Sequence, residues 1–184
     1  MTNTTLDDSV PPSLRPLLDD VAAARHRYVD FVSRLTDQQA QYKPAPDVWS
    51  AVDNTEHLYW AEHGGIWGMW RALEAYRNGT PVWTGERVNQ GRSIEDVVAA
   101  TWQPKEQVPA IAAPRLGGSP AFWCASLLNL QDLLLTFSRA IREDELEAVI
   151  HPHPISGPLD IRQRLAFLRF HIDRHRRQVE NLFT

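Results

Sequence analysis

The chain has a single cysteine, Cys124, among its 184 residues, so it cannot form an intrachain disulfide. Disulfides are rare in reducing compartments, and a lone cysteine in an apolar run favours a cytoplasmic location with a buried, unreactive thiol. Residues 1–9 are polar and lack the basic start and apolar run of a secretory signal. No apolar stretch reaches the length of a transmembrane helix, so we expect no membrane partner.

Excess positive charge is also missing. The formal net charge of −4 gives the chain no overall attraction to nucleic acid or to an anionic membrane surface. The sequence further lacks a P-loop, a glycine-rich dinucleotide fingerprint and a nucleophile elbow, which disfavours nucleotide chemistry. We therefore expect a small-molecule substrate and no nucleic-acid partner.

Apolar residues recur with helical spacing in four long stretches, and none alternates convincingly with the two-residue period of a strand. The stretches cover about residues 13–35, 50–77, 119–141 and 160–182. Hydrophobic residues make up 43% of the chain, which at this length is enough for one core. We predict an all-α fold, a four-helix bundle, in a single domain over residues 1–184 with its core at about 13–183.

Local signals mark the beginnings of three of these helices. A capping box pairs a side chain before the helix with one three residues later, and proline is favoured at the first helical position. The pairs are Ser50 with Asp53, Ser119 with Pro120, and Asp160 with Gln163.

A long crossover joins the second and third predicted helices. Residues 81–118 are rich in proline and glycine, and Ser93 begins a predicted short helix within them. The crossover is either a substrate lid or a packed connection with no functional role.

The second predicted helix carries a stripe of small residues that begins at His57. Its members follow at spacings of three and four: Ala61, Gly64, Gly68, Ala72 and Ala75. Each interior glycine costs about 0.8–1 kcal/mol relative to alanine, which favours a use for the glycines. We expect the stripe to let another helix approach closely.

His171 and His175 are four residues apart in the last predicted helix, and this spacing places both imidazoles on one face. His175 occupies an apolar seam position that packing would normally give to leucine or isoleucine, so its ring needs a polar partner. Bundles build metal sites from facing helices, which makes His57 the candidate third ligand. Three neutral imidazoles would hold a divalent cation and leave positions open for water or substrate.

The alternative is that His171 and His175 are a surface and a core histidine that only form hydrogen bonds. Ile172 stands where a His-Glu-x-x-His metalloprotease has its glutamate, so a zincin mechanism is excluded. A di-iron bundle would need Glu-x-x-His repeats, which this sequence lacks.

Other polar residues are assigned to the surface or to turns. We expect His26 on the surface and His63 well round its helix from His57. His151 and His153 lie in a proline-rich turn, where either could line the edge of a pocket. The last helix is strongly basic, and we expect most of its arginines to be solvated: Arg162, Arg164, Arg169, Arg174, Arg176 and Arg177.

Several of these features occur together in one known family. They are Trp49-Ser50 followed by Glu56-His57-Leu58, the His-Pro turn with Gly157, and Phe170-His171-x-x-x-His175-x-x-Gln178. From about residue 13 to 183 the chain resembles the DinB-like superfamily of metal-binding four-helix bundles, which includes bacterial thiol S-transferases. The long crossover departs from the better-defined transferases, and no thiol-recognition motif carries over.

The resemblance implies that His57, His171 and His175 bind a divalent metal, commonly zinc or nickel, at one end of the bundle. It also implies a low-molecular-weight thiol cosubstrate such as bacillithiol, mycothiol or glutathione, and assembly into a homodimer. Three tryptophans are candidates for either a pocket or the dimer interface: Trp60, Trp67 and Trp70.

The leading hypothesis is a metal-dependent thiol transferase or hydrolase in which the cation lowers the pKa of a thiol or water that attacks a small electrophile. One alternative is a non-catalytic bundle in which the cation only ties two helices together. Another is a small-molecule binding or resistance module. Asp53 and Glu56 are candidates to orient a metal ligand, and no further catalytic residue is assigned.

Overall fold

The computed structural model describes residues 9–103 and 107–183. Residues 1–8, which make up most of the segment that lacks a secretory signal pattern, lie outside the described residues. The described helices are α1 (Arg15–Val32), α2 (Asp37–Gln41), α3 (Ala51–Arg77), α4 (Ile94–Thr101), α5 (Pro120–Ala140) and α6 (Ile161–Glu180). Short 3-10 turns cover Pro12–Leu14, Ala110–Ala112 and Glu143–Glu145.

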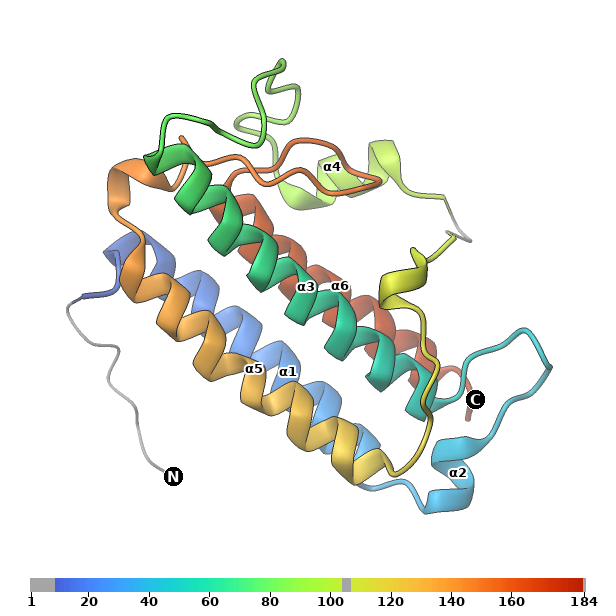
Figure 1. The fold of residues 1–184 in the computed structure, drawn as a ribbon. Coiled ribbons are helices and arrows are strands. Elements are labelled where there is room, and N and C mark those ends of the chain that lie inside the picture. Colours follow the sequence, from blue (N-terminus) through green and yellow to red (C-terminus); the bar gives the residue numbers. More distant parts are fainter. Residues whose placement is uncertain (1–8, 104–106, 184) are drawn as a thin grey trace.

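The four long helices lie side by side, and the short helices α2 and α4 lie outside them (Figure 1). Helix α1 packs against α5 and α6, and α3 packs against the same two helices, so one apolar core lies among all four. This arrangement confirms the predicted all-α class. Within the described residues, pairing of strand type is limited to two isolated bridges, Ile150 with Asp160 and His153 with Gly157.

The predicted helix beginnings are confirmed at α3 and α6. Ser50 and Asp53 exchange the two hydrogen bonds of a capping box, and so do Asp160 and Gln163. Ser119 precedes Pro120 as predicted, but its side chain makes no capping hydrogen bond. Helix α2 was not predicted, because its five residues are too few to show an apolar period.

The crossover between α3 and α5 contains the predicted short helix. Helix α4 begins after Ser93 and packs against α6. Together they enclose a second small apolar cluster, formed by Ile94, Val97, Val98, Leu159 and Phe167. As far as the chain is described, no helix combines the length and the apolar character needed to cross a bilayer.

A buried ion pair ties α1 to α3 inside the bundle. The Arg25 Nη2 atom lies 2.6 Å from Oε2 of Glu62, and the two side chains are 1% and 0% exposed. Arg25 also donates a hydrogen bond to Gln131 on α5. Burial raises the pKa of Glu62, and the neighbouring Arg25 charge opposes that rise.

Removing one partner of this pair should cost far more stability than removing both. Arg25→Met strands the Glu62 carboxylate, and we expect a loss of about 3–5 kcal/mol in the free energy of unfolding. The double variant Arg25→Met/Glu62→Leu should recover most of that loss, because apolar residues of similar volume often replace a buried pair without cost. Chemical denaturation measures all three proteins.

Arg27→Met is the matched control for this experiment. Arg27 lies on the same helix, is 52% exposed and pairs with Asp173 on α6, so its loss should cost less than about 1 kcal/mol. A double variant as unstable as Arg25→Met would contradict the assignment of the cost to the stranded carboxylate.

Candidate metal centre

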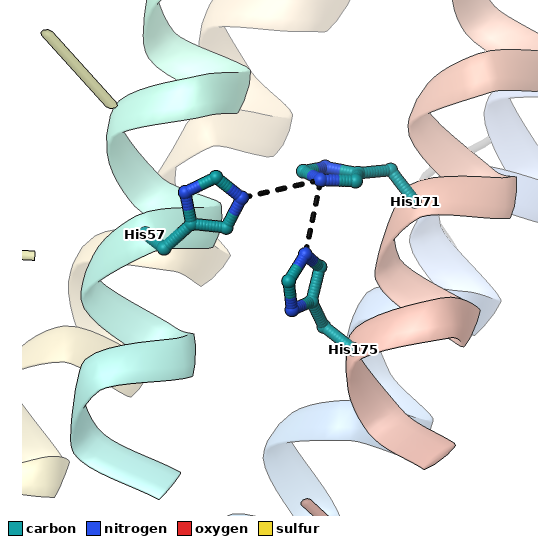
Figure 2. A group of neighbouring side chains, drawn as sticks. All are labelled: His57, His171 and His175. Atoms are coloured by element: carbon teal, nitrogen blue, oxygen red, sulfur yellow. Dashed lines mark hydrogen bonds between the residues drawn. The ribbon is translucent and has the colours of Figure 1, made fainter. Parts of the chain in front are cut away.

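The structure brings His57, His171 and His175 together, although 114 residues separate the first two. His57 projects from α3, and the other two project from α6 one turn apart (Figure 2). The Nε2 atom of His171 lies 3.2 Å from Nε2 of His57 and 3.1 Å from Nε2 of His175. All three side chains are buried, and their ligand atoms lie within 4.8 Å of one another.

Hydrogen bonds at the far side of two rings fix the position of their protons. His57 Nδ1 lies 2.8 Å from the carbonyl oxygen of Ala112, which can only accept, so this nitrogen carries the hydrogen. His175 Nδ1 lies 2.8 Å from Oδ1 of Asn54, whose amide nitrogen in turn donates to the Ser50 carbonyl. Both neutral rings therefore present a bare Nε2 lone pair toward His171.

This set of lone pairs suits a cation. A neutral His171 ring can offer at most one hydrogen from its Nε2 atom, so it can satisfy only one of the two neighbouring lone pairs. Two nitrogens that bind one zinc ion at about 2.0–2.1 Å and a tetrahedral angle lie roughly 3.4 Å apart. The two separations from His171 are close to that value, and all three ligand atoms lie within 4.8 Å of one another, so the group could hold a metal ion.

The three rings are held in the neutral form that ligands require. Burial lowers the pKa of His57, and the hydrogen bond to Ala112 offsets this only in part. Burial, together with nearby positive or titratable groups, holds the pKa values of His171 and His175 well below the usual range. Neutral imidazoles with free lone pairs are therefore available at neutral pH.

Aromatic rings enclose the group. Trp49, which precedes α3, stacks on His175 with ring centroids 6.3 Å apart and also contacts His57. Phe167 stacks on His171 at 5.5 Å from one turn earlier on α6. These rings restrict the orientation of the imidazoles and keep water from their outer faces.

The histidines lie in the wall of a large cavity between α3, α6 and the crossover. Its volume is about 1010 Å³, at the upper end of the range for small-molecule sites. The part of the crossover from Gln107 to Ala113 lines it, together with Trp60 and Trp102. The crossover therefore forms a wall of the cavity and supplies the carbonyl that orients His57, which gives it a positional role.

Glu56 attaches the crossover to α3 immediately beside His57. Its buried carboxylate accepts hydrogen bonds from the backbone N–H groups of Arg115, Leu116 and Gly117 at 2.8–3.1 Å, and from the Trp60 indole. Burial by itself would raise the pKa of Glu56, but these donors outweigh it, and the pKa is lowered. The crossover is thus bound to two successive residues of α3.

The two carboxylates predicted as candidates to orient a metal ligand make other interactions. Asp53 is engaged in the α3 capping box and an ion pair with Lys43, and Glu56 holds the crossover. The groups that orient the histidines are Asn54 and the Ala112 carbonyl, and neither was predicted from the sequence. The sequence places Asn54 one residue after Asp53, but it gives no sign of contact with a ring 121 residues away.

The turn histidines both line the cavity. His153 stacks on Trp102 and contacts Phe167, and its Nδ1 accepts hydrogen bonds from the Ile155 and Ser156 backbones. His151 has a buried Nδ1 with no hydrogen-bond partner.

The remaining two histidines, His26 and His63, are exposed and take no part in the cavity.

Two glycines of α3 lie against side chains: Gly68, which belongs to the small-residue stripe, and Gly65, which does not. A Cβ atom at Gly68 would lie 2.2 Å from Nε2 of His151, and one at Gly65 would lie 3.0 Å from Nη2 of Arg164. At Gly68 the close neighbour is therefore an imidazole and not the backbone of another helix, and at Gly65 it is a guanidinium. At Gly64 an added Cβ would meet nothing within 4 Å.

One arginine of α6 departs from the predicted solvated face. Arg164 is 4% exposed and lines the cavity, and its Nε and Nη1 atoms have no hydrogen-bond partner. Because α6 is rich in arginine, its sequence does not distinguish Arg164 from the other arginines. Only the fold shows that Arg164 is buried.

The two glycines give a matched pair of substitutions. Gly64→Ala gains helix propensity in open space and should raise the free energy of unfolding by about 0.5–1 kcal/mol. Gly68→Ala gains the same propensity but must displace the His151 ring, so we expect a net loss of stability. Thermal unfolding of the two variants compares them directly, and equal stabilisation by both would show that His151 does not pack against Gly68.

Comparison with known protein families agrees with the helical bundle and the histidine cluster described above. A family model described as the DinB superfamily matches residues 21–179, which include all three histidines and most of the bundle. No curated protein matches the chain. A match over this much of the sequence shows that the chain belongs to the DinB superfamily.

Proposed function

We propose that this DinB superfamily protein is a metal-dependent enzyme in which His57, His171 and His175 bind one divalent cation, zinc or nickel. Its reaction would transfer a low-molecular-weight thiol, or water, to a small electrophile. The observation that carries the proposal is the convergence of three Nε2 atoms, two of them with their protons fixed on the opposite nitrogen, at the wall of a large cavity.

The protein's own residues would perform distinct tasks in that reaction. The three imidazoles supply neutral ligand atoms, and Asn54 and the Ala112 carbonyl keep the rings in the binding tautomer. Trp49 and Phe167 exclude water from the outer faces of the rings. A divalent cation held by three protein ligands supplies Lewis acidity that lowers the pKa of a thiol or water at neutral pH.

The geometry favours catalysis over a purely structural metal. A closed structural zinc site normally has four protein ligands, whereas in the described residues the cluster consists of three histidines. The cavity beside them has room for a cosubstrate and an electrophile. A non-catalytic metal-stabilised bundle and a small-molecule binding or resistance module remain the competing functions, and the experiments below separate them.

Loss of one ligand should remove the metal and the activity together. Mass spectrometry of protein purified without an affinity tag or chelator should find about one metal ion per chain in the wild type and little in His171→Ala or His175→Ala. The matched control is His63→Ala, an exposed histidine on the same helix as His57, which should keep its metal. Full occupancy in His175→Ala would overturn the ligand assignment.

The loaded protein is then screened for thiol transfer and hydrolysis with bacillithiol, mycothiol, glutathione and water as nucleophiles. A metal that raises the thermal midpoint without supporting any turnover would favour the structural bundle, since a ligand bound only by the folded state stabilises it. Saturable binding of an electrophile without product would favour the binding module.

Asn54 should affect metal affinity through the tautomer of His175. Asn54→Ala removes the acceptor at Nδ1, and loss of such a partner typically lowers metal affinity by about 10–100-fold. Asn54→Asp keeps an acceptor at the same place and should retain most of the affinity. Competition with a chromophoric chelator measures the three affinities, and equal weakening by both substitutions would point to a packing role instead.

A cytoplasmic location and a homodimer also form part of the proposal. The buried Cys124 thiol, whose pKa is raised by burial, fits a protein that depends on no disulfide. Trp60 lines the cavity, whereas Trp67 is 61% exposed beside a small hollow formed with Trp70 and Leu133. Light scattering of the purified chain tests whether two copies associate.

A further inference from the structure

A positive charge without an anionic partner lies at the wall of the cavity, where the Arg164 guanidinium is 5.6 Å from the centroid of the Phe167 ring. The Arg164 side chain is 4% exposed, and its Nε and Nη1 atoms have no hydrogen-bond partner. An arginine stays charged in proteins, and a buried charge without a partner is costly. The other buried arginine, Arg25, has a carboxylate partner within 2.6 Å, so the lack of one at Arg164 is specific to this position.

No acidic side chain compensates Arg164 in the part of the chain that is described. Asp47 is the acidic residue among those that line the cavity, and it is exposed and engaged in other interactions. Burial lowers the pKa of Arg164 to about 10, and no carboxylate opposes that effect. The nearby His151 and His153 do not compensate the charge either, because an imidazole is neutral or positive; burial and then the Arg164 charge lower their pKa values to about 3, which keeps both rings neutral.

The charge lies on the same face of α6 as the histidine cluster. Arg164 precedes His171 by seven residues, which is two helical turns or roughly 10 Å along the axis. Leu168 lies between them, and all three residues line the cavity. On the opposite wall, Ala61, Gly64 and Gly65 leave the space between the two ends unfilled.

A second buried polar atom without a hydrogen-bond partner belongs to His151, which also lines the cavity. The atom is Nδ1, and the ring packs over Gly68, one turn along α3 from the glycine under Arg164. Buried polar atoms are normally satisfied, so unpaired groups on two neighbouring side chains mark a place where a ligand completes the site.

We propose that the cavity binds an elongated small molecule with a carboxylate or phosphate at one end, which pairs with Arg164 while the other end reaches the three histidines. The histidine end of this inference rests on the proposed function, whereas the Arg164 end does not. Carboxylate and phosphate are the groups that a guanidinium binds most strongly, because each accepts two of its hydrogen bonds.

Three probes with the same chain test the anionic end: hexanoate, hexyl phosphate and the neutral hexanamide. Quenching of tryptophan fluorescence reports binding, because Trp49, Trp60 and Trp102 line the cavity. We expect at least one anionic probe to bind about tenfold or more tightly than hexanamide, and the stronger of the two identifies the class of anion. Equal binding of all three probes by the wild-type protein overturns the proposal without any substitution.

Variants of Arg164 test whether this residue causes the preference for anionic probes. Arg164→Gln should abolish the difference between anionic and neutral probes, and Arg164→Lys should retain part of it. Arg174→Gln is the matched control, because Arg174 also lines the cavity from α6 and also lies over an aromatic ring, Trp102 at 4.9 Å, but is only half-buried. Loss of the preference in Arg174→Gln and its retention in Arg164→Gln would overturn the assignment.

The thermal midpoint of Arg164→Gln separates ligand binding from a role in folding. Removal of an unpaired buried charge should leave the midpoint unchanged or raise it. A large fall in the midpoint would show that Arg164 stabilises the fold, and it would overturn the proposal.

The same titrations after removal of metal with a chelator distinguish this inference from the proposed function. An anion preference that persists in a protein unable to bind metal supports the Arg164 site while the proposed metal-dependent function fails. Metal binding with no anion preference overturns the Arg164 site and leaves the proposed function intact.

Discussion

The hydrogen bonds at the Nδ1 atoms of His57 and His175 determine what the histidine cluster between α3 and α6 can bind. A carbonyl oxygen at one ring and an amide oxygen at the other keep the proton on Nδ1, so the two Nε2 lone pairs must face inward toward His171. Three buried imidazoles with the opposite tautomers could satisfy one another by donating and accepting. With the tautomers found here, the three imidazoles cannot satisfy one another, because their Nε2 atoms offer more lone pairs than hydrogens. An excess of lone pairs is what a cation requires of its ligands.

The tautomer of His57 depends on the crossover between α3 and α5, because a carbonyl of that segment accepts the hydrogen bond from its Nδ1 atom. The oxygen that fixes His57 belongs to Ala112, and Glu56 holds the following residues through hydrogen bonds from three backbone N–H groups. The carboxylate is buried and can stay ionised only because these donors replace its water. Because the same loop also lines the cavity, the orientation of the ligands and the shape of the binding space are set by one segment. A change that releases the crossover would therefore disturb both.

The sequence predicted the features that depend on local spacing and missed those that depend on tertiary contacts. Capping boxes at α3 and α6 join residues three apart, and the pairing of His171 with His175 is a single helical turn, so each could be read directly. The family resemblance supported His57, which no local pattern could connect to α6. The partners of the histidines come from positions 55 and 121 residues away, with no local signal. Arg25 and Arg164 resemble surface arginines in sequence, and only the neighbouring helices bury them.

The small residues of α3 are best explained by the space that they leave open. Gly68 has a steric reason, because the His151 ring occupies the place of its Cβ, and a Cβ at Gly65 would lie 3.0 Å from Nη2 of Arg164. Gly64 has no such neighbour, and packing would allow alanine there with a gain of helix propensity. Since Gly64 lines the cavity, a larger side chain at this position would project into the space between the histidines and Arg164. Gly64 thus lowers the helix propensity of α3 at a position where no contact requires glycine. This is expected if a ligand uses the space beside Gly64.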